Sequence, residues 1–219
     1  MNTTISDKEI SSEKICRLTD RIIAMGALCE VAIASAAKAL TTGDTALASK
    51  ALESDKLIDD KEREIETLCL KLLLEQPAPH ELRQISAALK MITDMERIGD
   101  QAADIAEIVT IAGIKTDDNT VNMDAMARAT IKKVTDSIDA YVSHNLELAR
   151  KVIAYDDVVD DFFTGIKESL ITLVAADPSR GSYILDLLMI AKYLERIGDH
   201  AVNIAEWVEF SITGEHYKK

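Results

Sequence analysis

Apolar residues recur every three or four positions through most of the chain, and this period is typical of an amphipathic α-helix. The first such stripe begins at Ile15 and continues to about Leu40, with Ser12 or an earlier serine as the expected N-cap. Gly43 can end this helix in a left-handed conformation, and Asp44 can cap the helix that follows. The sequence therefore opens with two long helices joined by a short turn.

Further stripes predict helices at about 45–76, 80–112, 123–142, 145–176 and 181–212. All three prolines fall at the predicted breaks, where proline cannot continue a helix. The periodicity is lost over 114–122, so we place a boundary there and expect two units, at 1–116 and 117–219. The predicted fold class is all-α, with two tandem antiparallel three-helix bundles related by internal duplication.

One twelve-residue pattern occurs twice, and the second copy begins ninety-nine positions after the first. The copies read Glu-Arg-Ile-Gly-Asp-Gln-Ala-Ala-Asp-Ile-Ala-Glu (96–107) and Glu-Arg-Ile-Gly-Asp-His-Ala-Val-Asn-Ile-Ala-Glu (195–206). Nine of the twelve positions are identical, which indicates that the chain arose by tandem duplication.

The acidic residues of this motif lie on the helix face opposite the apolar stripe, because they are three or four positions apart. The preceding helix of each half adds two aspartates at the same spacing. Like charges so placed destabilise a helix, and a hard cation bound by carboxylate oxygens would relieve the repulsion. The candidate ligands are Asp55, Asp59, Glu96, Asp100 and Asp104, then Asp156, Asp160, Glu195 and Asp199, with neutral Asn203 in the last place. The alternative interpretation is a solvated acidic face.

Two other residue types in the motif have structural interpretations. Gly99 and Gly198 stand in mid-helix, where glycine is unfavourable, and we interpret them as points of close helix packing. Arg97 is expected to pair with Asp94 or Asp100, because these lie one helical turn away.

Charge and composition narrow the possible functions. The formal net charge of −13 repels nucleic acid, so we expect no nucleic-acid ligand. The N-terminus lacks the pattern of a signal peptide, and no apolar run suggests a membrane span, so we expect a cytoplasmic protein without direct membrane insertion.

The chain has no P-loop, GxSxG or HExxH motif, and no catalytic residue is predicted. A carboxylate-bundle metalloenzyme or metal-storage protein is the alternative function, although the Glu-x-x-His motif of di-iron bundles is missing from both copies.

The repeated motif resembles that of the PhoU family of phosphate-transport accessory regulators. The resemblance implies a cytoplasmic, usually dimeric regulator that is not an enzyme. Its implied partners are the ATPase subunit of the high-affinity phosphate ABC transporter and, in bacteria, a phosphate-sensing histidine kinase. It also implies divalent or trivalent metal ions (Fe, Zn, Mn or Mg) at the E/DxxxD pairs. Two positions depart from an even repeat, since Asn203 replaces Asp104 and Tyr193 replaces Asp94.

Overall fold

Helices form nearly all of the described chain in a computed structural model, which covers residues 3–116, 121–155 and 157–216, with side chains from residue 13 onward. The first half comprises α1 (Thr3–Thr42), α2 (Thr45–Leu74) and α3 (Pro79–Ala112). The second comprises α5 (Met123–Val142), α6 (Leu146–Ala154), α7 (Asp157–Ala176), a 3-10 turn (Pro178–Arg180) and α8 (Gly181–Thr213). No strand occurs within these residues, and the all-α prediction is confirmed.

Several helices begin or end at the capping residues that the sequence predicted. Gly43 and Gly113 adopt left-handed φ angles of 72° and 59°, which a residue without a Cβ accepts at no steric cost. Asp44 accepts a hydrogen bond from the backbone N–H of Ala46 at 2.9 Å and so caps α2. Asn145 caps α6 in the corresponding place of the second half.

Two boundaries differ from the prediction. The first helix begins at Thr3 rather than near Ser12. The helix expected over 145–176 is interrupted after Tyr155, whose backbone N–H bonds back to Lys151 and Val152. A new helix then starts at Asp157, where acids in the first turn are stabilised by the partial positive charge of the helix N-terminus. The spacing of apolar residues continues across the interruption between α6 and α7, so it could not predict that interruption.

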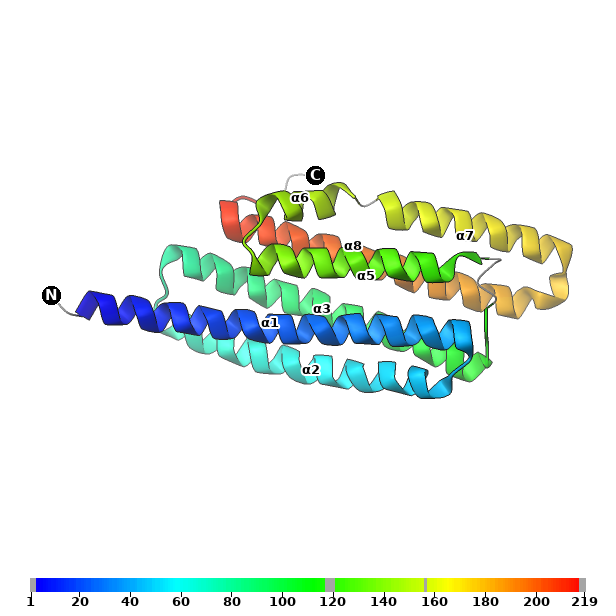
Figure 1. The fold of residues 1–219 in the computed structure, drawn as a ribbon, viewed down its shortest axis with the longest axis horizontal. Coiled ribbons are helices and arrows are strands. Elements are labelled where there is room, and N and C mark those ends of the chain that lie inside the picture. Colours follow the sequence, from blue (N-terminus) through cyan, green and yellow to red (C-terminus); the bar gives the residue numbers. More distant parts are fainter. Residues whose placement is uncertain (1–2, 117–120, 156, 217–219) are drawn as a thin grey trace.

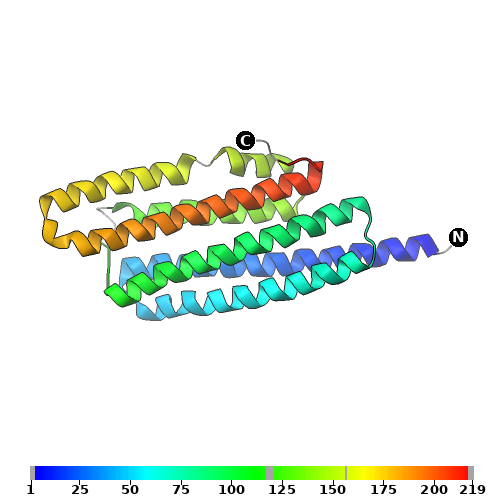
Figure 2. The same cartoon turned by 180° about the vertical axis from the view of Figure 1, so that it is seen from behind.

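The two halves lie side by side rather than end to end (Figures 1 and 2). Helix α1 packs along α5, and α3 packs along α8, so these four helices form the centre of the molecule. Helix α2 covers one outer side, and α6 with α7 covers the other. One continuous hydrophobic core therefore spans both halves.

Helix α1 is more apolar than we expected. Its segment Glu13–Thr42 is long and apolar enough to cross a membrane by length and composition, so the expectation that no such stretch exists is wrong. Half of the most apolar window is buried inside the protein, and Leu18, Ile22 and Met25 are fully enclosed. Packing in the hydrophobic core accounts for the apolar residues on the buried face of this helix.

Candidate functional site

The first motif lies on α3, where Gly99 faces α2 at close range. A Cβ at this position would lie 2.9 Å from Oδ1 of Asp55 and 3.0 Å from Cδ1 of Ile58. The glycine thus lets the α2 backbone and the Asp55 carboxylate approach α3. The prediction that Gly99 serves close helix packing is confirmed.

The carboxylate of Asp55 is the most perturbed acid of the cluster. Its Oδ1 is buried without a hydrogen-bond partner. Burial, followed by the negative charges of Asp100, Asp59 and Asp104, raises the pKa of this carboxyl to about 6. The packing of α2 against α3 therefore brings the acidic residues of both helices together in the first half.

The acidic cluster extends further along α2 than its predicted ligands. Burial and Asp100 raise the pKa of Glu96, and burial also raises that of Asp104. Glu62 was missed, although burial and then Glu66 raise its pKa and its charge acts on Glu96. Its position three residues after Asp59 was the available sequence signal.

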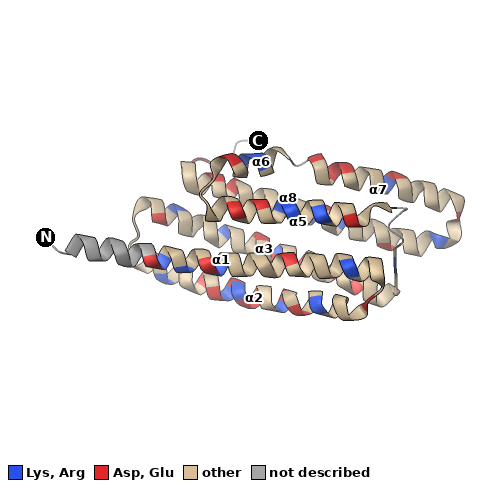
Figure 3. Ribbon diagram, viewed as in Figure 1, with Lys and Arg blue, Asp and Glu red and all other residues tan. Residues whose placement is uncertain are grey.

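Basic side chains partly neutralise this face. Arg97 pairs with Asp100 at 3.2 Å and with Glu96 at 3.4 Å, so of the two predicted partners Asp100 is confirmed. Arg63 reaches Asp59 at 3.4 Å. Figure 3 shows acidic and basic bands alternating along α2, while the acids at the start of α7 lie among uncharged positions.

The second motif has a different environment. Gly198 again gives close packing, since a Cβ there would lie 3.3 Å from Cγ1 of Val159 on α7. Both carboxylate oxygens of Glu195 accept hydrogen bonds from Lys192, which stands one helical turn earlier. Asp160 and Asp199 each have a polar or electrostatic partner. Asp156 lies outside the described residues.

The two positions that break the repeat lie at the contact between α3 and α8. Asn203 donates a hydrogen bond to Oδ1 of Asp94 at 3.0 Å, and Nδ1 of His200 lies 2.9 Å from the same oxygen. Tyr193 hydrogen-bonds Asp104 from the other helix. The side chains of Asp94 and His200 are only 15% and 19% exposed. These polar contacts therefore tie the two halves together inside a largely apolar interface.

The donor set of the first half suits a hard cation. An unpartnered buried carboxylate oxygen and acids that raise one another's pKa are features that a bound cation would relieve. Among the described residues, however, no group of three or more His, Cys, Asp or Glu side chains is arranged to hold a metal ion. Metal binding by the ten predicted ligands therefore stays a prediction.

Comparison with known proteins accounts for the two-fold repetition. The family description "PhoU domain" matches the chain twice, over residues 22–109 and 123–208. The phosphate-specific transport system accessory protein PhoU homolog of Clostridium acetobutylicum is 33% identical over 211 residues, which cover 95% of this chain and 96% of that relative. The homolog of Pseudomonas aeruginosa is 35% identical over 197 residues, with 88% and 81% of the two chains covered.

Solved structures agree with this assignment. The crystal structure of PhoU from Pseudomonas aeruginosa superimposes with a TM-score of 0.86 at 32% identity, over 93% of this chain and 99% of that one. The phosphate transport system regulatory protein PhoU from Streptococcus pneumoniae has the same fold, with a TM-score of 0.84 at 23% identity over 95% of this chain and all of that one. With two matched domains and relatives of this identity along nearly its whole length, the chain belongs to the PhoU family.

Proposed function

We propose that this protein regulates phosphate uptake as a cytoplasmic accessory of the high-affinity phosphate ABC transporter. The observation that carries the proposal is the double PhoU-domain match, combined with full-length relatives named as accessory proteins of phosphate-specific transport. In this role the protein contacts the transporter ATPase subunit and a phosphate-sensing histidine kinase, and restrains phosphate-starvation signalling. It acts as an adaptor, without catalysis of its own, and self-associates as a homodimer.

The charge of the protein supports binding to a basic protein surface. The net charge is −13, and the acidic side chains of the cluster on α2 and α3 are partly exposed to solvent. Complementary charge speeds the encounter of two proteins and rejects partners of like charge. The same charge supports the expectation that nucleic acid is not a partner.

We propose in addition that the first acidic cluster binds a metal ion through Asp55, Asp59, Glu96, Asp100 and Asp104. Support comes from the buried, unpartnered oxygen of Asp55 and from the raised pKa values around it. Carboxylate oxygens are ligands that suit hard cations such as Mg²⁺ and Mn²⁺. A cation held there would join α2 to α3 and change the charge of the face offered to a partner.

Co-purification tests the partner assignment. The tagged protein is recovered from crosslinked membranes of phosphate-replete and phosphate-starved cells, and bound proteins are identified by mass spectrometry. We expect the transporter ATPase subunit in the replete sample. If no transporter subunit is recovered under either condition, the adaptor proposal is wrong.

A pair of variants tests whether the acidic cluster takes part. Asp55→Asn combined with Asp100→Asn removes two charges from the cluster. The control is Asp60→Asn, because Asp60 is exposed on the same helix as Asp55 and pairs with Arg63. We expect the double variant to lose bound metal by elemental analysis after purification in metal-free buffer, and the control to retain it. Equal metal content in all three proteins would contradict the metal assignment without affecting the partner assignment.

A further inference from the structure

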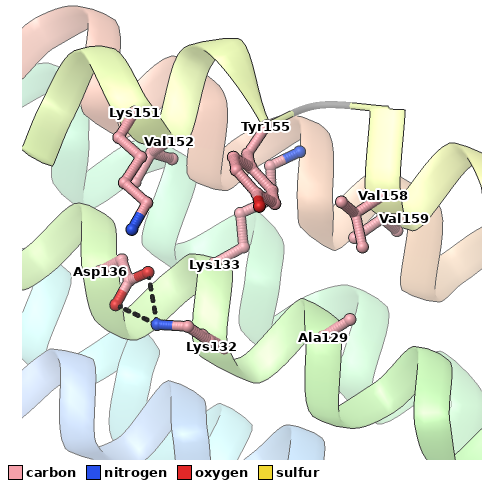
Figure 4. Close-up of a pocket in the computed structure, with 9 residues that line it drawn as sticks. All are labelled: Ala129, Lys132, Lys133, Asp136, Lys151, Val152, Tyr155, Val158 and Val159. Atoms are coloured by element: carbon pink, nitrogen blue, oxygen red, sulfur yellow. Dashed lines mark hydrogen bonds and ion pairs between the residues drawn. The ribbon is translucent and has the colours of Figure 1, made fainter.

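We infer that the second half carries a binding site for a small carboxylate with a short apolar body. The site is an open cavity of about 180 Å³ lined by residues of α5, α6 and the start of α7 (Figure 4). Its size suits a molecule of fewer than about ten non-hydrogen atoms, because the cavity is smaller than the pockets that hold drug-sized ligands. No residue of this cavity is among those that the proposed function uses.

The polar end of the cavity is formed by Lys151 in the last turn of α6 and by Tyr155, the C-cap residue of that helix. Lys151 and Tyr155 lie four residues apart and so project from the same face of the helix. Figure 4 shows the Lys151 nitrogen and the Tyr155 oxygen both directed toward α5. Within the described part of the chain, neither the ammonium group nor the hydroxyl has a hydrogen-bond or ion-pair partner. The ammonium group and the hydroxyl can each donate a hydrogen bond to the oxygens of a bound carboxylate.

The facing side of the cavity carries an ion pair between residues four positions apart on α5. Lys132 donates to both oxygens of Asp136, at 2.9 Å and 2.7 Å. This pairing neutralises Asp136, so that its carboxylate does not repel an anion bound to Lys151. Lys133 also lines the cavity but is already engaged in a polar or electrostatic contact. We therefore assign ligand binding to Lys151 and Tyr155.

The remaining wall is aliphatic and explains why the ligand needs an apolar body. Ala129 of α5, Val152 of α6, and Val158 and Val159 of α7 form this wall. A bare inorganic anion would leave these side chains in contact with water, whereas an alkyl chain would bury them favourably. Lysine is a point charge rather than a planar fork, which suits a monoanionic head group.

The corresponding place in the first half is built differently. Lys132 and Tyr155 stand one hundred and one positions after Val31 and Ser54. In the first half Ser54 is buried, and its hydroxyl donates to the Lys50 carbonyl of its own helix at 2.9 Å. Helix α2 also continues unbroken through this region, whereas its counterpart is interrupted after Tyr155.

A ligand in the cavity would change the packing around the second motif. Val159 lines the cavity, and its Cγ1 is the atom that a Cβ on Gly198 would meet at 3.3 Å. A ligand that repositions Val159 must therefore alter the packing of α7 on the motif helix α8. Val159 thus connects the cavity directly to Gly198 of the second motif.

Titration with hexanoate, followed by methyl NMR and calorimetry, tests the inference. We expect saturable binding with a dissociation constant of about 1 mM, the affinity that a ligand of this size reaches at moderate efficiency. The methyl signals of Val152, Val158 and Val159 should shift. Hexylamine, which has a similar body and the opposite charge, and inorganic phosphate, which has charge but no body, should not bind there.

Matched variants separate the specific site from general attraction between charges. Lys151→Met should weaken hexanoate binding roughly tenfold or more, because it removes a charge-assisted hydrogen bond. Tyr155→Phe should weaken it by a smaller factor. Lys50→Met, at the corresponding place of the first half, should leave it within about twofold of the original affinity.

Three results would overturn the inference. The first is the absence of saturation up to about 10 mM hexanoate, ten times the expected dissociation constant. The second is equal weakening by Lys151→Met and Lys50→Met, and the third is binding of hexylamine with the same methyl shifts. Circular dichroism of each variant confirms that its helices are intact, and the exposed position of Lys151 makes its replacement structurally mild.

Discussion

Asp94 of α3 accepts a hydrogen bond from Asn203 of α8 at 3.0 Å, and this contact joins two positions at which the repeated halves differ. Ninety-nine positions after Asp94 stands Tyr193, whose partner Asp104 stands ninety-nine positions before Asn203. The two contacts are therefore counterparts of each other across the α3–α8 interface. If positions 94, 104, 193 and 203 were all aspartate, four carboxylates would face one another across this interface.

The Asp94–Asn203 contact gives the first prediction. Asn203→Asp places a second carboxylate beside Asp94 in a partly buried interface, and we expect it to lower the free energy of unfolding by about 1–3 kcal/mol. The double variant Asp94→Asn/Asn203→Asp restores one charge and one amide, and should recover much of this loss. Asp94→Asn alone completes the cycle, and urea denaturation at pH 7.5 with a chelator present measures the original protein and the three variants. If the two single changes are simply additive, the side chains do not interact.

The raised pKa of Asp55 gives the second prediction, on pH dependence. Burial and neighbouring acids raise this pKa to about 6 in the folded protein, so the native state keeps its proton while the unfolded chain, with a pKa of about 4, has lost it. This group therefore makes the folded protein less stable as pH rises from about 4 to about 6.

Asp55→Asn removes that titration. Since Asp55 is only partly buried, solvent screens the repulsion, and we expect a gain of about 1 kcal/mol, or roughly 2–4 °C in Tm, at pH 7.5. The gain should shrink to nothing near pH 4. Differential scanning calorimetry at the two pH values, in metal-free buffer, measures this effect. A gain that is the same at both values would refute the titration argument.

The unequal packing of the two motif glycines gives the third prediction. A Cβ at Gly99 would lie 2.9 Å from Oδ1 of Asp55 and 3.0 Å from Cδ1 of Ile58, closer than van der Waals contact allows, whereas at Gly198 the nearest atom, Cγ1 of Val159, is 3.3 Å away. Overpacking a helix contact costs about 1–3 kcal/mol, against a gain of about 1 kcal/mol from replacing a mid-helix glycine by alanine. We expect Gly99→Ala to be the less stable of the two variants. Equal thermal unfolding temperatures would contradict this comparison.

Lys192 gives the fourth prediction, on metal binding. This lysine holds both oxygens of Glu195, while the corresponding residue of the first half is Thr93, whose hydroxyl contacts Glu62. A cation adjacent to the carboxylates opposes binding of a metal ion. The first half should therefore bind metal more tightly, and metal should leave Glu195 and Asp199 first under graded chelation.

Lys192→Thr reproduces the first half at this position and should raise the affinity of the second site. Mn²⁺ titration monitored by electron paramagnetic resonance counts the bound ions and orders their affinities. Removing one unit charge close to the site should strengthen Mn²⁺ binding by roughly tenfold, because affinity at carboxylate sites follows ligand charge. An unchanged titration would mean that Glu195 is not a ligand.

Local chemistry alone predicted most of the secondary structure. The positions of Gly43, Gly113 and Asp44 follow from backbone preferences and side-chain capping, which act over a few residues. The start of α1 and the interruption after Tyr155 were not predicted. A periodic apolar stripe continues across such a break, and where the two helices part depends on how α6 and α7 pack against α5 and α8.

The sequence by itself determined the duplicated all-α fold, the family resemblance, and which acidic residues share one face of each helix, because the spacing of residues on a helix fixes which side chains project together. Only the tertiary structure decided which face meets which helix. It placed Asn203 against Asp94 and Tyr193 against Asp104, and set Lys151 and Tyr155 over a cavity. These contacts join residues far apart in the chain, and their partners are chosen by the packing of the two halves against one shared core.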